Sequence, residues 1–168
     1  MPSIKAVIGH NASNATLQAA PIYHKAGIVM ITPTSFDTEI SSIGEHIYRT
    51  TPNIRHLAET LVDYSLDKAR RKKVAVCFDS QAADNLAFKE EFVNTLIEKG
   101  GNYIATNCDF AAPDFSATAM ASQLISDGAD AVLLTPHIDR LDRLIDLSKA
   151  NQWRLVLMGS PSLETQKF

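Results

Sequence analysis

The chain has 168 residues, of which 45% are hydrophobic and 21% are charged, and its formal net charge is −3. This composition is normal for a globular protein with a hydrophobic core, and the length suits one ordinary domain or one and a half small lobes. The acidic balance gives no basic footprint for nucleic acid, and no apolar run approaches the ~20 residues that cross a bilayer.

The first third of the chain predicts an incomplete α/β unit. Short apolar or extended runs predict strands, and helical spacing of apolar residues fills the stretches between them. The predicted strands are 6–8 and 27–31, followed by a short extended piece at 47–49, and the predicted helices are 13–24 and 54–69. The two strands and the one helix that precede residue 53 cannot close a core alone. We therefore place a boundary at Pro52–Asn53, after a partial unit formed by residues 1–52.

Residues 53–168 predict a nearly complete α/β unit. Its predicted strands are 74–78, 103–106, 131–134 and 155–158, and helices between them end at Gly100, before Gly128 and near Asn151. Strands that recur about every 25–30 residues with a helix between them are typical of right-handed βαβ units. The predicted fold is a doubly wound, Rossmann-like parallel sheet with strand order 2-1-3-4 and helices on both faces.

The two cysteines, Cys77 and Cys108, fall in or at the end of predicted strands. They form neither a metal-binding spacing nor a disulfide framework, so we expect two small, buried apolar side chains. The beginning of the chain shows no charged region followed by an apolar one, as a signal peptide would. This leaves open a cytoplasmic protein or a chain whose beginning is missing.

No catalytic signature is present in the sequence. It contains no Gly-rich phosphate loop, no H-E-x-x-H and no G-x-S-x-G, and its five histidines show no i, i+4 ligand spacing. Asp79 follows a strand as a phospho-acceptor aspartate would, but the preceding strand does not end in an acidic pair. We therefore predict neither an enzyme nor a metal or other cofactor.

Small polar residues follow the strands at what should be one edge of each sheet. They lie at 10–14, 32–35, 135–137 and 159–162. Ligands of open α/β sheets bind outside the carboxyl ends of the strands, and the free N–H groups of a helix that opens at Ser13 or Asn14 favour an anion. For any one loop taken alone, ordinary N-capping and turn formation are the better explanation. Four such loops together favour a hydrogen-bonding cleft for a small polar ligand.

An ordered set of segments resembles one known family. The segments are Val7–Ser13, Ala20–Tyr23, Ala26–Ile28, Ile31–Ser35, Tyr48–Pro52, Val74–Val76, Asp114–Ala117 and Met158–Gly159. Together they resemble the type I periplasmic solute-binding proteins, which include the branched-chain amino-acid receptors of ABC transporters. The resemblance implies two α/β lobes that clasp a ligand, with residues 1–52 as a partial first lobe and 53–168 as the second, and it implies a fragment of an extracytoplasmic protein.

The resemblance also implies which residues meet the ligand. Ser13 matches a serine that holds the ligand carboxylate at a helix start, and Thr34 matches a position whose backbone contacts the ligand. Phe36 stands where amino-acid binders place a threonine, and His137 stands where an aromatic residue is usual. The predicted ligand-binding set consists of these four residues and two neighbours of theirs: Ser13, Asn14, Thr34, Ser35, Phe36 and His137.

The residues that would hold an α-ammonium group are absent. Ile54 replaces the aspartate that pairs with it in the family, and Pro161 replaces an acidic partner in the second lobe. An ammonium group without a partner would be desolvated at a cost of several kcal/mol. The sequence therefore favours an organic acid over an α-amino acid.

We interpret the chain as a ligand-binding module, either the receptor of an ABC transporter or an extracytoplasmic sensor domain. Its partners would be a small-molecule ligand and a membrane permease or a fused signalling domain, without nucleic acid. Unpaired strand edges in residues 1–52 also predict self-association into a homo-oligomer. The alternatives are a flavodoxin-like or receiver-like signalling domain, a hydrolase using His10 or His137 with a serine, and a degenerate member that makes only protein contacts.

Overall fold

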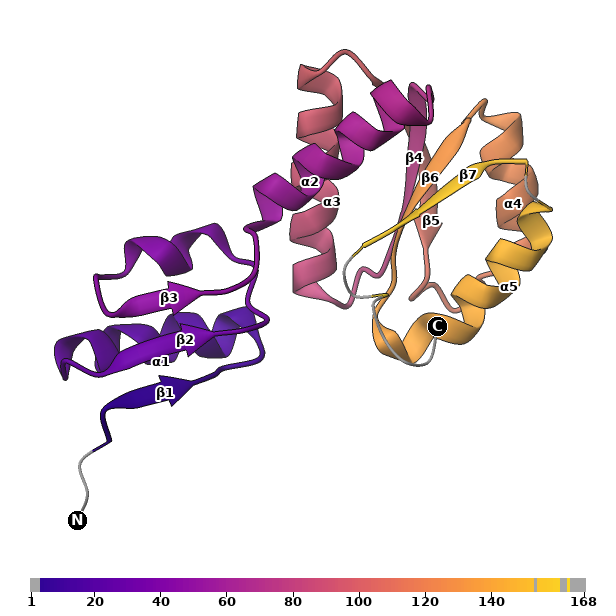
Figure 1. Ribbon diagram of the computed structural model, residues 1–168. Helices are drawn as coiled ribbons and strands as arrows, with labels where there is room; N and C mark the ends of the chain where they lie inside the picture. The colour runs from indigo at the N-terminus through magenta and orange to yellow at the C-terminus, as the bar shows by residue number, and fades with distance from the viewer. Residues whose placement is uncertain (1–3, 153, 161–162, 164–168) are drawn as a thin grey trace. The chain divides into compact units, whose positions relative to one another are not determined.

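A computed structural model describes residues 4–152, 154–160 and 163 of the chain. The chain divides into two compact units, Met1–Leu57 and Ala58–Phe168, and each is described by itself (Figure 1). The division falls inside helix α2 (Ile54–Asp63), a few residues after Pro52–Asn53. Helix α2 continues as a π-helical segment, η2 (Tyr64–Lys68), where the sequence predicts one uninterrupted helix.

The first unit is a three-stranded parallel sheet with one covering helix. Its strands are β1 (Ala6–Ile8), β2 (Val29–Thr32) and β3 (Ile47–Arg49), in the order β1-β2-β3, with helix α1 (Ser13–Lys25) and the 3₁₀ segment η1 (Thr38–Ser42). Ala20 of α1, Met30, Ile40 and Ile47 form its small core. Strand β2 begins later than the sequence predicts, because Gly27 has a φ of 67° in the turn after α1.

The second unit is an open parallel sheet with helices on both faces. Its strands are β4 (Lys73–Phe78), β5 (Asn102–Asp109), β6 (Ala131–Thr135) and β7 (Val156–Gly159), in the order β5-β4-β6-β7. Every pairing is parallel, which confirms the predicted 2-1-3-4 order and the doubly wound fold.

Helices cover both faces of this second sheet. They are α3 (Ala83–Glu98), α4 (Ala117–Ser126) and α5 (Leu141–Asn151), and a 3₁₀ turn, η3 (Ile138–Arg140), leads into α5. Figure 1 shows α3 on one side of the sheet and α4 with α5 on the other. All residues from 74 to 78 in β4 are buried, as expected of a strand covered on both faces. The predicted helix stops at Gly100 and Gly128 are confirmed by φ values of 82° and 83°.

The expectation for the two cysteines is wrong in one respect. Both are fully buried, as predicted, but Cys77 and Cys108 form a disulfide with a Cα–Cα distance of 4.5 Å. The reason is an irregularity in the pairing of β4 with β5, where Ala75 lies opposite Ile104 but Cys77 lies opposite Cys108. A regular ladder would have placed Thr106 opposite Cys77, so strand positions alone do not reveal the bond.

Across residues 4–152 and 154–160, no helix combines the length and the hydropathy that a bilayer crossing requires.

Candidate functional site

Three hydroxyl groups fix the two loops at the carboxyl edge of the first sheet. Thr16 of α1, Thr32 of β2 and Ser35 of the following loop each donate to the backbone carbonyl of His10, at 3.2, 2.8 and 3.1 Å. The three residues are fully buried, and the hydroxyls of Thr16 and Ser35 are 2.7 Å apart. Ser35 therefore lies at the predicted edge, but its hydroxyl is engaged within the protein and joins the loop after β2 to the loop after β1.

The start of helix α1 presents hydrogen-bond donors at the same edge. The N-cap residue is Ala12, which offers no side-chain acceptor, and the first turn contains no acidic residue. Ser13 is 7% exposed, and its Oγ accepts a hydrogen bond from the backbone N–H of Phe36 at 3.2 Å. Because that bond uses the oxygen as an acceptor, the hydroxyl proton of Ser13 can be donated to another group.

The remaining predicted residues of the first unit lie beside Ser13. Asn14 and Thr34 are exposed, and Phe36 is half-buried. The Thr34 hydroxyl donates to the carbonyl of Asn11 at 2.8 Å, which brings the loop after β2 against the loop after β1. The structure thus gathers the five predicted residues of this unit, Ser13, Asn14, Thr34, Ser35 and Phe36, at one edge of its sheet.

Ile54 also reaches this edge. Its backbone N–H donates to the carbonyl of Phe36 at 2.9 Å, so the first residue of α2 lies next to the loop that carries Phe36. The side chain at this position is apolar and half-buried. The donors at the start of α1 therefore have two apolar residues, Phe36 and Ile54, on the neighbouring segments.

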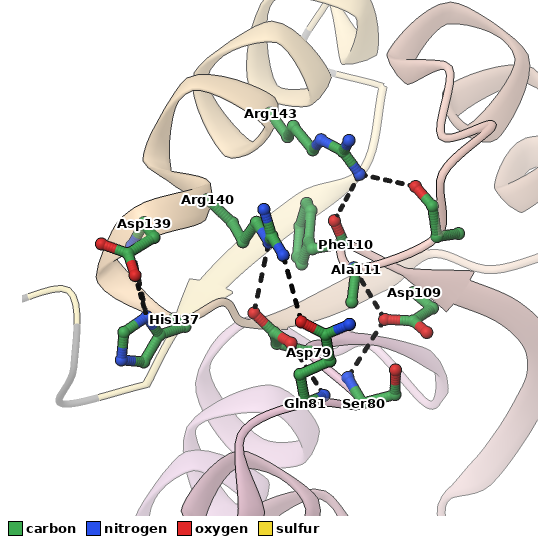
Figure 2. A network of polar contacts seen from close by, with 11 residues as sticks. Asp79, Ser80, Gln81, Asp109, Phe110, Ala111, His137, Asp139, Arg140 and Arg143 are labelled. Carbon is green, nitrogen blue, oxygen red and sulfur yellow. Dashed lines mark hydrogen bonds and ion pairs between the residues drawn. The ribbon is translucent and has the colours of Figure 1, made fainter.

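The carboxyl edge of the second sheet carries a network of charged groups (Figure 2). Asp79, which follows β4, is 2% exposed, and its carboxylate accepts a hydrogen bond from the backbone N–H of Gln81 at 2.9 Å. Figure 2 shows Arg140 of η3 reaching across to both residues, with its Nε 3.7 Å from Asp79 Oδ2 and its Nη2 3.3 Å from Gln81 Oε1. Asp79 is thus a buried carboxylate that is paired with Arg140.

His137, the one predicted site residue of the second unit, lies at this same edge. It is exposed, and its Nδ1 is 3.2 Å from Oδ2 of Asp139. The polar pattern of the sequence did not point to Arg140. Arg140 follows His137 by three residues and so falls on the same side of a 3₁₀ turn, and this spacing could have indicated that the two residues share the edge.

Asp109, at the end of β5, anchors the loop beside this network. Burial acts to raise the pKa of Asp109, but hydrogen bonds from the Ser80 side chain and from the backbone N–H groups of Ala111 and Ser80, with the charge of Lys89, hold it below its ordinary value. The two backbone bonds measure 2.8 Å from Ala111 and 3.1 Å from Ser80. The folded protein therefore favours the ionised form of the Asp109 carboxylate, which holds the loop through these hydrogen bonds.

We expect the stability of the chain to depend on this charge in acid. Because the folded state lowers the pKa of Asp109, its contribution is fully present above the unfolded-state pKa of about 3.9 and is lost as the pH falls through the lower folded-state value. The Asp109→Asn variant should therefore lose less stability than the wild type between about pH 5 and pH 3. Urea denaturation at several pH values measures this, and parallel pH dependences in the two proteins would contradict it.

Within the part of the chain that the structure describes, no group of three or more His, Cys, Asp or Glu side chains is placed to hold a metal ion.

A family model described as periplasmic binding protein matches residues 2–160, nearly the whole chain. The chain belongs to the periplasmic binding protein family. This is a family of binding proteins and not of enzymes, as the sequence predicts, so the hydrolase alternative is set aside.

Several relatives of this periplasmic binding protein are similar to it over most of its length. The Leu/Ile/Val/Thr-binding protein of Salmonella typhimurium is 27% identical over 158 residues, which cover 93% of this chain and 42% of that protein. A substrate-binding protein of an ABC transporter from Desulfitobacterium hafniense, solved in complex with Leu, has a TM-score of 0.75 at 20% identity and is matched over 47% of its length, with 94% of this chain covered. A solute-binding protein of an ABC transporter from R. palustris, solved in complex with 4-hydroxybenzoate, has a TM-score of 0.73 at 18% identity, with 96% of this chain and 44% of that chain covered.

The two solved structures establish the fold alone, because their identity is low. The chain spans less than half the length of the curated relatives it matches. The match of the family model confirms the predicted family, and the two solved structures confirm the predicted type I fold.

Proposed function

We propose that this chain forms part of a solute-binding protein that binds a small organic acid, serving an ABC transporter permease or a fused signalling domain. The observation that carries the proposal is the start of helix α1, where Ser13 can donate its hydroxyl proton beside a first turn that has no acidic residue. Such a helix start favours an anion, since its N–H groups point at the ligand and the helix dipole is positive there.

Two features support an acid without an ammonium group. Ile54, where amino-acid receptors of the family place an aspartate, is apolar and bonded through its backbone to Phe36. A ligand ammonium group beside Ile54 and Phe36 would lose water without gaining a partner. Pro161, the other replaced acidic position, lies outside the described residues. Of the two ligands named for the similar structures, the aromatic acid of the R. palustris protein matches this chemistry better than leucine does.

We assign different roles to the other predicted residues. Asn14 and Thr34 are exposed at the edge and would contact the ligand, whereas the buried Ser35 would support the loop that carries Phe36. In the second unit, His137 is exposed at the carboxyl edge of its own sheet, and we assign it a ligand-contacting role as well.

The disulfide supports an extracytoplasmic location. Disulfides persist in oxidising compartments and are rare in the cytosol. The bond between Cys77 and Cys108 therefore agrees with a periplasmic protein.

A thermal-shift panel tests the proposed ligand class. It compares aromatic and aliphatic carboxylates with leucine, isoleucine and glutamate, on this chain and on the longest reading frame that contains it. A ligand that binds only the folded state raises the melting temperature by mass action, so carboxylates should raise it more than the amino acids do. Equal stabilisation by leucine and by the best acid would contradict the proposal.

We also propose that the chain self-associates through its first unit. By strand alternation Ile8, Ile31 and Tyr48 lie on the sheet face opposite to Met30 and Ile47, and Ile8 and Tyr48 are 81% and 54% exposed. An apolar face and an open edge strand rarely stay in water. Light scattering should therefore detect dimers or larger species of the 168-residue chain, and Ile8→Lys should shift them toward monomer.

Ile22 provides the matched control for this prediction, since it is 69% exposed but lies on helix α1. The Ile22→Lys variant should associate as the wild type does. A monomer at high concentration, or equal effects of the two substitutions, would show that the sheet face of the first unit is not the contact.

A further inference from the structure

Two histidines meet at the end of the first unit where α1 stops. His24 lies in the last turn of α1, and His46 directly precedes β3. Their Nδ1 atoms are 3.2 Å apart, their ring centroids are 5.3 Å apart, and both side chains are half-buried. Neither residue has a part in the proposed function.

The backbone around the two rings is fixed. A Cβ atom at Gly44 would collide with the ring of His24, so the ring occupies space that only a glycine leaves open. The carbonyl of His46 accepts a hydrogen bond from the backbone N–H of Met30 at 2.8 Å, which ties it to the core strand β2. The approach of the two Nδ1 atoms therefore follows from the packing of the unit and needs no rearrangement of exposed loops.

We propose that His24 and His46 bind a transition-metal ion such as Zn²⁺ through their Nδ1 atoms. Two imidazole nitrogens at about 2.0–2.1 Å from a tetrahedral Zn²⁺ are roughly 3.3–3.4 Å apart, close to the separation in the structure. Imidazole is a ligand that Zn²⁺, Cu²⁺ and Ni²⁺ accept, and water can fill the other positions. The C-terminal end of α1 also favours a positive charge.

Metal binding would replace the hydrogen bond that joins the rings. In that bond one Nδ1 carries a proton and the other accepts it. With the metal bound, both Nδ1 atoms would give their lone pairs to the ion and each ring would keep its proton on Nε2. One proton therefore moves from Nδ1 to Nε2 of one ring, and the net charge of the protein itself does not change.

Calorimetric titration of ZnCl₂ into the tag-free chain tests this site. We expect one Zn²⁺ per chain, and His24→Asn or His46→Asn should each weaken binding by about tenfold or more, since the loss of a direct ligand should cost at least as much as the loss of a group that orients one. His56→Asn is the matched control, because His56 is an exposed histidine of the same unit and should leave binding unchanged. Mg²⁺, which prefers oxygen ligands, should produce no comparable heat.

A readout on the wild type keeps the test valid if a variant fails to fold. In histidine-detected NMR, Zn²⁺ should shift or broaden the ring resonances of two of the five histidines, and the effect should weaken in acid because protonated imidazole does not bind metal. Equal Zn²⁺ affinity in the wild type and the folded His24→Asn variant would overturn the proposal. So would ring resonances that remain unchanged at saturating Zn²⁺.

Discussion

Replacement of both cysteines by alanine is expected to lower the free energy of unfolding by about 3–4 kcal/mol. The disulfide joins residues 31 positions apart, and the estimate is the loop-closure entropy that a bond of this span removes from the unfolded chain. The loss is large compared with the roughly 5–15 kcal/mol of a typical domain. Urea denaturation of the oxidised wild type and the double variant measures the difference.

The reduced wild type is the control, because reduction breaks the bond without creating the cavities that two alanines would leave in the core. Both sulfur atoms are fully buried, so the reductant must be present while the chain unfolds and refolds. The reduced protein should then lose most of what the double alanine variant loses. If reduction leaves the denaturation midpoint unchanged, or if mass spectrometry finds two free thiols after oxidative refolding, the disulfide does not stabilise this protein.

Ser13→Ala is expected to weaken the binding of a carboxylate ligand by roughly ten- to a hundredfold. The estimate follows from a hydrogen bond to a charged group, which contributes about 1.5–3 kcal/mol. Ser13 is nearly buried, and its oxygen already accepts from the Phe36 N–H, so the hydroxyl is held in one place. Calorimetry with the best acid from the thermal-shift panel measures the change.

Ser42→Ala is the matched control for this prediction. The Ser42 hydroxyl donates to the carbonyl of Glu39 within η1, and Ser42 is exposed. The same loss of a hydroxyl should therefore leave affinity within about twofold, as expected of a surface substitution. Equal losses in the two variants would mean that Ser13 does not contact the ligand.

The sequence alone predicted the second sheet because its signals are local. The apolar run 74–78 and the glycine stops at Gly100 and Gly128 each act within one element, and a regular βα period then gives the parallel order. The disulfide was missed because it depends on the pairing irregularity that brings Cys108 opposite Cys77. Such a shift in pairing cannot be predicted from the order of apolar and polar residues along the two strands.

The grouping of the candidate site residues was predictable from the sequence, but their internal bonding was not. Polar residues after strands predicted that Ser13, Thr34 and Phe36 share one edge of a sheet, and these residues do lie together there. The sequence does not reveal that the Ser35 hydroxyl turns inward, because its partner Thr16 lies 19 residues away on another element. Arg140 was missed for a similar reason, since Asp79 is reached only across the sheet edge.

Equilibrium binding of leucine and of 4-methylpentanoate tests the central claim most directly. The two ligands share a carboxylate and an isobutyl group and differ in the α-ammonium group alone, which is the group that Ile54 and Phe36 would leave without a partner. Calorimetry on the longest reading frame that contains this chain should show that 4-methylpentanoate binds about tenfold or more tightly than leucine. Leucine binding as tightly as 4-methylpentanoate, or more tightly, would contradict the account.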